Sequence, residues 1–258
     1  MTETAESVAV SAVFGGGGHF GIAYGLGVVD TLVGAGLDLS EAPLLGTSAG
    51  SWVSACIATG VTIDQLADLP EVRVPDTRPG LLRDVAREVF ADRMAPRVTV
   101  SAVRLPAMRR EFLSGADFPL ADLVAASSAV PGLFRPAQVG ASSYVDGGVR
   151  SLVSADHAAP ARNLLVIAPI AGPMFGPAGR TMELMLRREL SRWERRSGGT
   201  VHFVRPNTQI ARLARTPRQL FDVQRAAAAY ELALAQTASL INDRRWFEGL
   251  TASSSDAA

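Results

Sequence analysis

Two glycine turns, each joining a short apolar strand to a helix, constrain the fold of this chain most. Residues 8–14 are small or branched and apolar, which predicts a buried strand, and residues 21–37 predict a helix. Between them lie four consecutive glycines, Gly15 to Gly18. The same order returns at once: strand 43–45, turn 46–50 and helix 51–58. Strands that alternate with helices are typical of an α/β sheet with helices on its faces.

The rest of the chain continues the alternation. We expect further helices at residues 81–90, 106–113, 120–129, 180–196 and 217–242, and further strands at 98–103, 143–145, 164–168 and 201–204. The length of 258 residues fits one large domain, which we assign to residues 1–250, and residues 251–258 are expected to be a disordered tail.

The composition excludes several kinds of chemistry. All 25 basic residues are arginine, so the chain has no P-loop lysine, Schiff-base lysine or Ser-Lys dyad. One cysteine, Cys56, rules out an internal disulfide and a CxxC zinc site, and three histidines make a His-rich metal site an unfavourable hypothesis. Because the 25 acidic residues balance the arginines, we expect no nucleic-acid partner.

The location of the protein is predicted from what the sequence lacks. The first seven residues carry Glu3 and Glu6 and no basic residue, unlike a signal peptide. No uninterrupted apolar run reaches 18 residues, so we expect no transmembrane helix and a cytoplasmic protein.

The first glycine turn could bind an anion. Its backbone amides are uncovered at a helix start, where they can bind a phosphate or an oxyanion. The spacing Gly16-x-Gly18-x-x-Gly21 also fits the dinucleotide fingerprint, but the second strand is not followed by the acidic residue that would hold a ribose. A tight turn without function is the remaining alternative.

The second glycine turn has the pattern of a nucleophile elbow, G-x-S-x-G: Gly46-Thr47-Ser48-Ala49-Gly50. Such a turn holds a serine hydroxyl at the N-terminus of a helix. The Ala49 amide and the helix dipole would then favour a developing oxyanion. In this strand-turn-helix context we interpret Ser48 as a nucleophile.

A serine nucleophile needs a base. The run Tyr144-Val145-Asp146-Gly147-Gly148 delivers a carboxylate from a strand into a glycine turn, which by itself could be an ordinary Asp-Gly turn. Asp146 with His157 or His202 would also give the Ser, Asp, His order of an α/β-hydrolase. However, the elbow follows only the second strand, and His202 lies inside a predicted strand, where a structural role is expected.

Taken together, the glycine loop, the elbow and the Asp-Gly-Gly turn resemble the patatin-like phospholipase family. The run from Ala126 to Pro136 is also similar to the family's stretch before the aspartate, and the resemblance spans about residues 8–170. It implies a three-layer α/β/α sandwich with a mostly parallel central sheet, and hydrolysis of acyl esters of lipids without metal or organic cofactor.

The resemblance also assigns roles to residues. Ser48 would be the nucleophile and Asp146 the base of a Ser-Asp dyad. The oxyanion hole would comprise backbone amides of Gly16, Gly17, Gly18 and Ala49. The glycines that shape the three motifs are Gly21, Gly46, Gly50, Gly147 and Gly148.

Substrate and partners are less constrained. Phe20 stands where many relatives carry Arg or Lys, which argues against a preference for anionic phospholipid head groups, so a neutral lipid, lysolipid or simple carboxylic ester is an alternative substrate. A silent acyl-binding module of the same fold and a nucleotide-binding oxidoreductase are alternatives.

The helix at 180–196 could contact an anionic membrane, but we favour a packed helix on which Glu183, Glu189 and Glu194 offset the arginines of a solvated face. The oligomeric state stays open.

Overall fold

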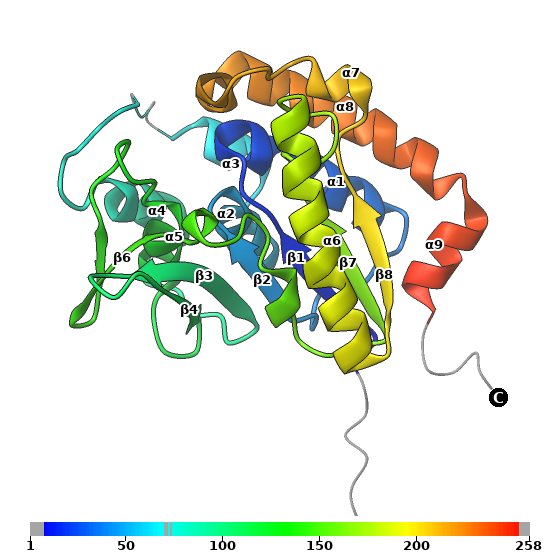
Figure 1. Cartoon of the computed structure of the whole chain (residues 1–258), viewed down its shortest axis with the longest axis horizontal. Helices are drawn as coiled ribbons and strands as arrows, with labels where there is room; N and C mark the ends of the chain where they lie inside the picture. The colour runs from blue at the N-terminus through cyan, green and yellow to red at the C-terminus, as the bar shows by residue number, and fades with distance from the viewer. Residues whose placement is uncertain (1–7, 70–71, 73, 253–258) are drawn as a thin grey trace, which may run out of the picture.

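A central sheet of eight strands forms the middle of the molecule. Figure 1 shows a computed structural model, in which residues 8–69, 72 and 74–252 are described. The strands span Val10–Phe14 (β1), Leu44–Thr47 (β2), Val98–Arg104 (β3), Arg109–Ser114 (β4), Ala137–Val139 (β5), Ser142–Asp146 (β6), Asn163–Ile167 (β7) and Thr200–Val204 (β8). Their order is β5-β6-β3-β2-β1-β7-β8, with β4 paired to β3. The neighbouring strands β3, β2, β1, β7 and β8 run parallel to one another. Strands β4, β5 and β6 pair in antiparallel fashion.

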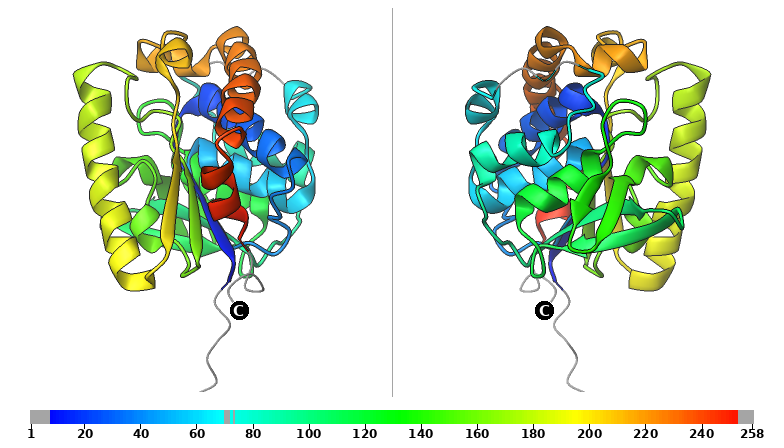
Figure 2. Two further views of the ribbon diagram at one scale, coloured as in Figure 1. Left: turned by 90° about the vertical axis from the view of Figure 1, so that its right-hand side faces the viewer. Right: turned by 90° about the vertical axis from the view of Figure 1, so that its left-hand side faces the viewer.

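Helices cover both faces of the sheet. They span Gly18–Gly34 (α1), Ala49–Thr59 (α2), Ile63–Ala67 (α3), Leu81–Phe90 (α4), Leu120–Ser128 (α5), Pro177–Ser197 (α6), Thr208–Ala211 (α7), Val223–Ile241 (α8) and Arg244–Thr251 (α9). Short 3-10 turns occur at Gly147–Val149 (η1), Ala155–His157 (η2) and Pro217–Phe221 (η3). Figure 2 shows α6 on one face and α1, α2 and α8 on the other. The predicted α/β/α sandwich with a mostly parallel sheet is therefore confirmed.

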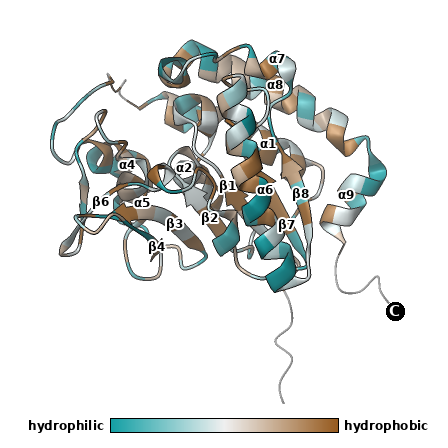
Figure 3. Ribbon diagram, viewed as in Figure 1, coloured by the Kyte–Doolittle hydropathy of each residue, from teal (hydrophilic) through white to brown (hydrophobic). Residues whose placement is uncertain are grey.

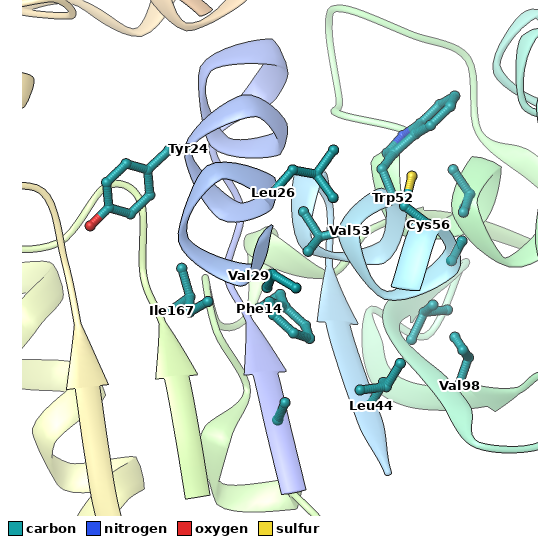
Figure 4. Close-up of a cluster of buried hydrophobic side chains, with 14 of the residues drawn as sticks. Phe14, Tyr24, Leu26, Val29, Leu44, Trp52, Val53, Cys56, Val98 and Ile167 are labelled. Atoms are coloured by element: carbon teal, nitrogen blue, oxygen red, sulfur yellow. The ribbon is translucent and has the colours of Figure 1, made fainter. Parts of the chain in front are cut away.

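Alternating side chains of the strands fill two hydrophobic layers. Phe14, Leu44 and Ile167 lie in the larger cluster, under α1 and α2 (Figure 4). Val13 points to the opposite face and joins a smaller cluster that includes Trp193 of α6. In Figure 3, hydrophobic residues lie on the strands at the centre, and hydrophilic residues lie at one end of α6. Among the described residues, no helix combines the length and the hydropathy needed to cross a bilayer.

The predicted helix at 106–113 is wrong. The chain turns after β3 and returns as strand β4, which pairs with β3 from Arg104↔Arg109 to Thr99↔Ser114. Its one buried side chain is Leu113, so its composition is that of a half-exposed edge strand. Pairing with β3 decides the structure here, and this is a tertiary contact that a local pattern does not contain.

The helix predicted at 217–242 is correct only in part. Its first turn is the 3-10 helix η3, and Asp222 then adopts an extended conformation, with φ −81° and ψ 117°. The Asp222 carboxylate accepts a hydrogen bond from the Arg225 amide at 3.0 Å and caps the start of α8. Of the predicted tail, Thr251 ends α9 and Ala252 is described, whereas residues 253–258 lie outside the described part of the chain. The domain boundaries stay a prediction.

Candidate active site

Strands β2 and β6 meet end to end along one edge of β3. Thr47, the last residue of β2, pairs with Ser101, and Asp146, the last residue of β6, pairs with the next residue, Ala102. The opposite edge of β3 is occupied by β4 over the same stretch, so β2 and β6 must share an edge. Because the two strands run in opposite directions, their carboxyl ends face each other there. This register brings Ser48 to Asp146.

Ser48 sits in a strained turn that its glycine neighbours make possible. Its φ is +54° and its ψ is −120°, a conformation that costs a non-glycine residue about 1–3 kcal/mol. A Cβ atom at Gly50 would lie 1.9 Å from the Phe14 carbonyl oxygen, and one at Gly46 would lie 2.4 Å from the Gly50 carbonyl oxygen. The sequence pattern G-x-S-x-G is therefore required by close backbone contacts. Helix α2 begins directly after the serine, at Ala49.

Ser127 holds the backbone of the elbow. Its hydroxyl oxygen accepts a hydrogen bond from the Ser48 amide at 2.9 Å and its hydroxyl donates to the Ser101 carbonyl oxygen at 2.8 Å. The side chain is fully buried at the end of α5. Ser127 was not among the predicted site residues, although it lies in the run from Ala126 to Pro136 that carried part of the resemblance.

Asp146 is a buried carboxylate with two hydrogen-bond donors. It is 4% exposed, and burial raises its pKa from 3.8 to about 6, although hydrogen bonds from the Ser48 hydroxyl and the Gly148 amide oppose the rise. The Gly148 amide lies 2.6 Å from Oδ1. A Cβ atom at Gly147 would lie 2.4 Å from the Ser101 carbonyl oxygen, which explains the first glycine of the turn. The carboxylate is thus ionised at neutral pH and in contact with the serine hydroxyl.

The first glycine turn passes beside the elbow. A Cβ atom at Gly16 would lie 3.3 Å from the Cβ of Ser48, and Gly18, with φ +56°, begins α1. Among the described residues, none accepts a hydrogen bond from the amides of Gly17, Gly18 or Ala49. The Gly16 amide differs, because it donates to the Leu152 carbonyl oxygen at 2.8 Å. The expectation that Gly16 contributes an oxyanion donor is therefore corrected: its role is to permit close approach.

Gly21 serves the packing of this turn. Its amide donates to the Gly17 carbonyl oxygen at 2.8 Å, and a Cβ atom there would lie 3.1 Å from the Ala49 Cβ. The first turns of α1 and α2 consequently lie against each other, and each helix has N-terminal amides without a helical acceptor.

Among the described residues, no hydrogen bond or ring contact joins either candidate histidine to Ser48 or Asp146. His202 lies on β8, three strands away from β2, and its Nε2 hydrogen-bonds to the Asn163 side chain at 3.2 Å. His157 ends η2, where its ring stacks on Phe112. These are structural contacts, as the sequence indicated for His202. The described residues include no group of three or more His, Cys, Asp or Glu side chains that could hold a metal ion.

A hollow of about 520 Å³ opens near the carboxyl end of β3. It is lined by residues 78–83, Leu105, Pro106, Ala125, residues 134–138 and Ser143. None of the predicted site residues lines it. Ser143, the residue of β6 that lines the hollow, is three residues from Asp146, about 10 Å along the strand.

The comparisons with known proteins bear on these motifs. Residues 76–159 match the model of the patatin-like phospholipase family, a stretch that contains Ser127 and the Asp146 turn and begins after Ser48. A search of curated proteins finds no match to the chain. Among solved structures, VipD from Legionella pneumophila is similar, with 13% identity, a TM-score of 0.41, and coverage of 91% of this chain and 67% of that chain. The family match therefore shows similarity to patatin-like phospholipases over residues 76–159, about a third of the chain.

Proposed function

We propose that this chain is a serine acyl hydrolase that cleaves carboxylic ester bonds of acyl lipids through Ser48 and Asp146. The family suggests lipid ester hydrolysis. The observation that carries the proposal is the hydrogen bond from the Ser48 hydroxyl to the buried Asp146 carboxylate, whose pKa is raised to about 6. A carboxylate in this range is ionised at pH 7, yet it is a stronger base than an exposed aspartate.

The first half-reaction forms an acyl-enzyme. The Ser48 oxygen attacks the ester carbonyl carbon while its proton passes to Asp146. The resulting tetrahedral oxyanion would be bound by the amides of Gly17, Gly18 and Ala49, supported by the N-terminal dipole of α2. Collapse of the intermediate breaks the ester bond, and the proton moves from Asp146 to the leaving alcohol.

The second half-reaction restores the enzyme. Water attacks the acyl carbonyl carbon and gives a proton to Asp146. A second tetrahedral oxyanion forms at the same amides, and its collapse releases the fatty acid and returns the proton to Ser48. The strained φ of Ser48 supports this cycle, because it keeps the hydroxyl at the start of α2 and prevents it from capping that helix.

A silent acyl-binding module of the same fold is the competing function. It would keep the pocket and the glycine loop but would need no contact between Ser48 and a base. The hydrogen bond between Ser48 and Asp146 favours the enzyme. Labelling by a fluorophosphonate probe separates the two, because it requires an activated serine.

Hydrolysis of p-nitrophenyl esters of graded chain length tests the proposal. We expect Ser48→Ala to lose at least about 10³-fold in kcat, and Asp146→Asn to lose about 10²–10⁴-fold. Ser239→Ala, at an exposed position of α8, is the matched serine control and should keep wild-type kcat. A folded wild type that hydrolyses neither these esters nor phospholipid vesicles, and that the probe does not label, would overturn the proposal.

Contact with a lipid surface would bring such an enzyme to its substrate. On α6, Leu184 and Met185 are 62% and 61% exposed and adjoin the exposed Arg188, a combination that suits an anionic interface. We propose peripheral contact at this place. Co-sedimentation with vesicles that contain anionic phospholipid tests it, and the double variant Leu184→Ser/Met185→Ser should bind less. Equal binding by both proteins would refute the contact without touching the hydrolase proposal.

A further inference from the structure

The segment between Ser151 and Ala155 bridges the glycine loop and the elbow. It follows the Asp-Gly-Gly turn directly. The carbonyl oxygen of Leu152 accepts the Gly16 amide at 2.8 Å, and the carbonyl oxygen of Val153 accepts the Thr47 hydroxyl at 3.3 Å. One short segment therefore contacts the residues that precede the proposed oxyanion donors and the nucleophile.

The same segment is anchored to β3. The Ser154 hydroxyl donates to the Ser101 hydroxyl oxygen at 3.0 Å, and Ser154 is fully buried with φ +61°. Ser101 also accepts, through its carbonyl oxygen, the hydroxyl of Ser127 that holds the elbow. A non-glycine residue keeps such a backbone conformation only when its surroundings impose it. A group outside the sheet also holds the segment.

Glu189 of α6 supplies that group. Its Oε1 accepts the Ser151 hydroxyl at 2.5 Å and its Oε2 accepts the Ala155 amide at 3.0 Å. The side chain is only 12% exposed, and Arg110 lies 4.0 Å away. Ser151 in turn accepts the Ser154 amide at 2.8 Å. One carboxylate thus closes both ends of the segment, with a separate acceptor oxygen for each donor.

We infer that Glu189 is a positioning residue for the proposed hydrolase, which fixes the segment from Ser151 to Ala155 and through it the spacing between the glycine loop and Ser48. The inference rests on the proposed function. It follows from the contacts, because the Gly16 amide and the Thr47 hydroxyl have their partners in this segment. Loss of the carboxylate leaves the buried Ala155 amide and the half-buried Ser151 hydroxyl without this acceptor and frees the segment to shift. Displacements of about 1 Å between catalytic groups can lower rates about 10²-fold.

The kinetic test compares Glu189→Ala with Glu183→Ala. Glu183 lies on the same helix with a similarly buried side chain, but its partners are Arg187 and Arg205 and not the segment. We expect Glu189→Ala to lower kcat about 10- to 100-fold with little change in KM. Glu189→Gln, which keeps one acceptor oxygen, should fall in between, and Glu183→Ala should keep wild-type kcat. Equal kcat in all four proteins would overturn the inference, as would equal losses at both positions.

Amide hydrogen exchange tests the same inference without catalysis. In Glu189→Ala the amides of Gly16 and Ala155 should exchange at least about tenfold faster than in Glu183→Ala, because their acceptors are displaced or removed. Unchanged protection at Gly16 would overturn the inference. If Glu189→Ala does not fold, Glu189→Gln serves in both measurements. A wild type without esterase activity would refute the proposed function, and the exchange data would still decide the role of Glu189.

Discussion

The buried charge of Asp146, the proposed catalytic base, should measurably lower the stability of the protein. In the unfolded chain an aspartate has a pKa near 3.8, whereas burial raises the pKa of Asp146 to about 6 in the folded protein. The folded state therefore binds the proton more tightly. The free energy of unfolding falls as pH rises between these two values, and the cost is fully present above about pH 6. At about 1.4 kcal/mol per pKa unit, it amounts to about 3 kcal/mol.

Asp146→Asn removes the charge and keeps the shape. The asparagine Oδ1 can still accept the Gly148 amide, and its Nδ2 can donate to the Ser48 hydroxyl oxygen. We expect the variant to be more stable than the wild type by up to about 3 kcal/mol above pH 6. The difference should shrink as pH falls and vanish below about pH 4. The same variant should have lost its esterase activity, so that stability and function change in opposite directions.

Urea unfolding at pH 8, 6 and 4.5 measures this difference, and Asp68→Asn, which alters an exposed carboxylate, is the control. The control should change stability by less than about 0.5 kcal/mol at every pH. In wild type, kcat/KM should fall tenfold per pH unit below about pH 6, as Asp146 takes up a proton. An asparagine variant that is no more stable than wild type at pH 8 would refute the reasoning. A difference that does not depend on pH would do so as well.

Three further predictions concern the surroundings of the proposed dyad. Ser127→Ala should lower kcat about tenfold, measured with p-nitrophenyl esters, because the Ser48 amide loses its acceptor, and full activity would show that the elbow needs no such support. Gly50→Ala should lose at least about 3 kcal/mol in urea unfolding, whereas Gly34→Ala, with nothing within 4 Å of the new Cβ, should stay within about 1 kcal/mol. His202→Ala should keep kcat per folded molecule within about twofold, and a loss by orders of magnitude would revive a Ser-Asp-His mechanism.

The parts of the fold that are encoded locally could be predicted from the sequence. Strands β1 and β2 and the helices after them carry both a hydrophobic pattern and the glycines of their turns, so their order was correct. Strand β4 was mistaken for a helix and β5 was missed, because each is short and half-exposed and gains its structure by pairing with a neighbour. Such pairing depends on residues distant in the sequence, which propensity does not contain.

The candidate site divides in the same way. Motifs pointed to Ser48 and Asp146 one at a time, but only the register of β3 shows that β2 and β6 end face to face. The sequence analysis predicts that Glu189 belongs to the solvated charges of α6, yet the sequence holds a contrary signal. It is three residues after Leu186 and four before Trp193, and both of these are buried. Helical spacing therefore puts a carboxylate on the apolar side of an amphipathic helix. A charge in that position needs partners. Its partners here are Ser151 and Ala155, at the two ends of the segment that contacts the glycine loop and the elbow.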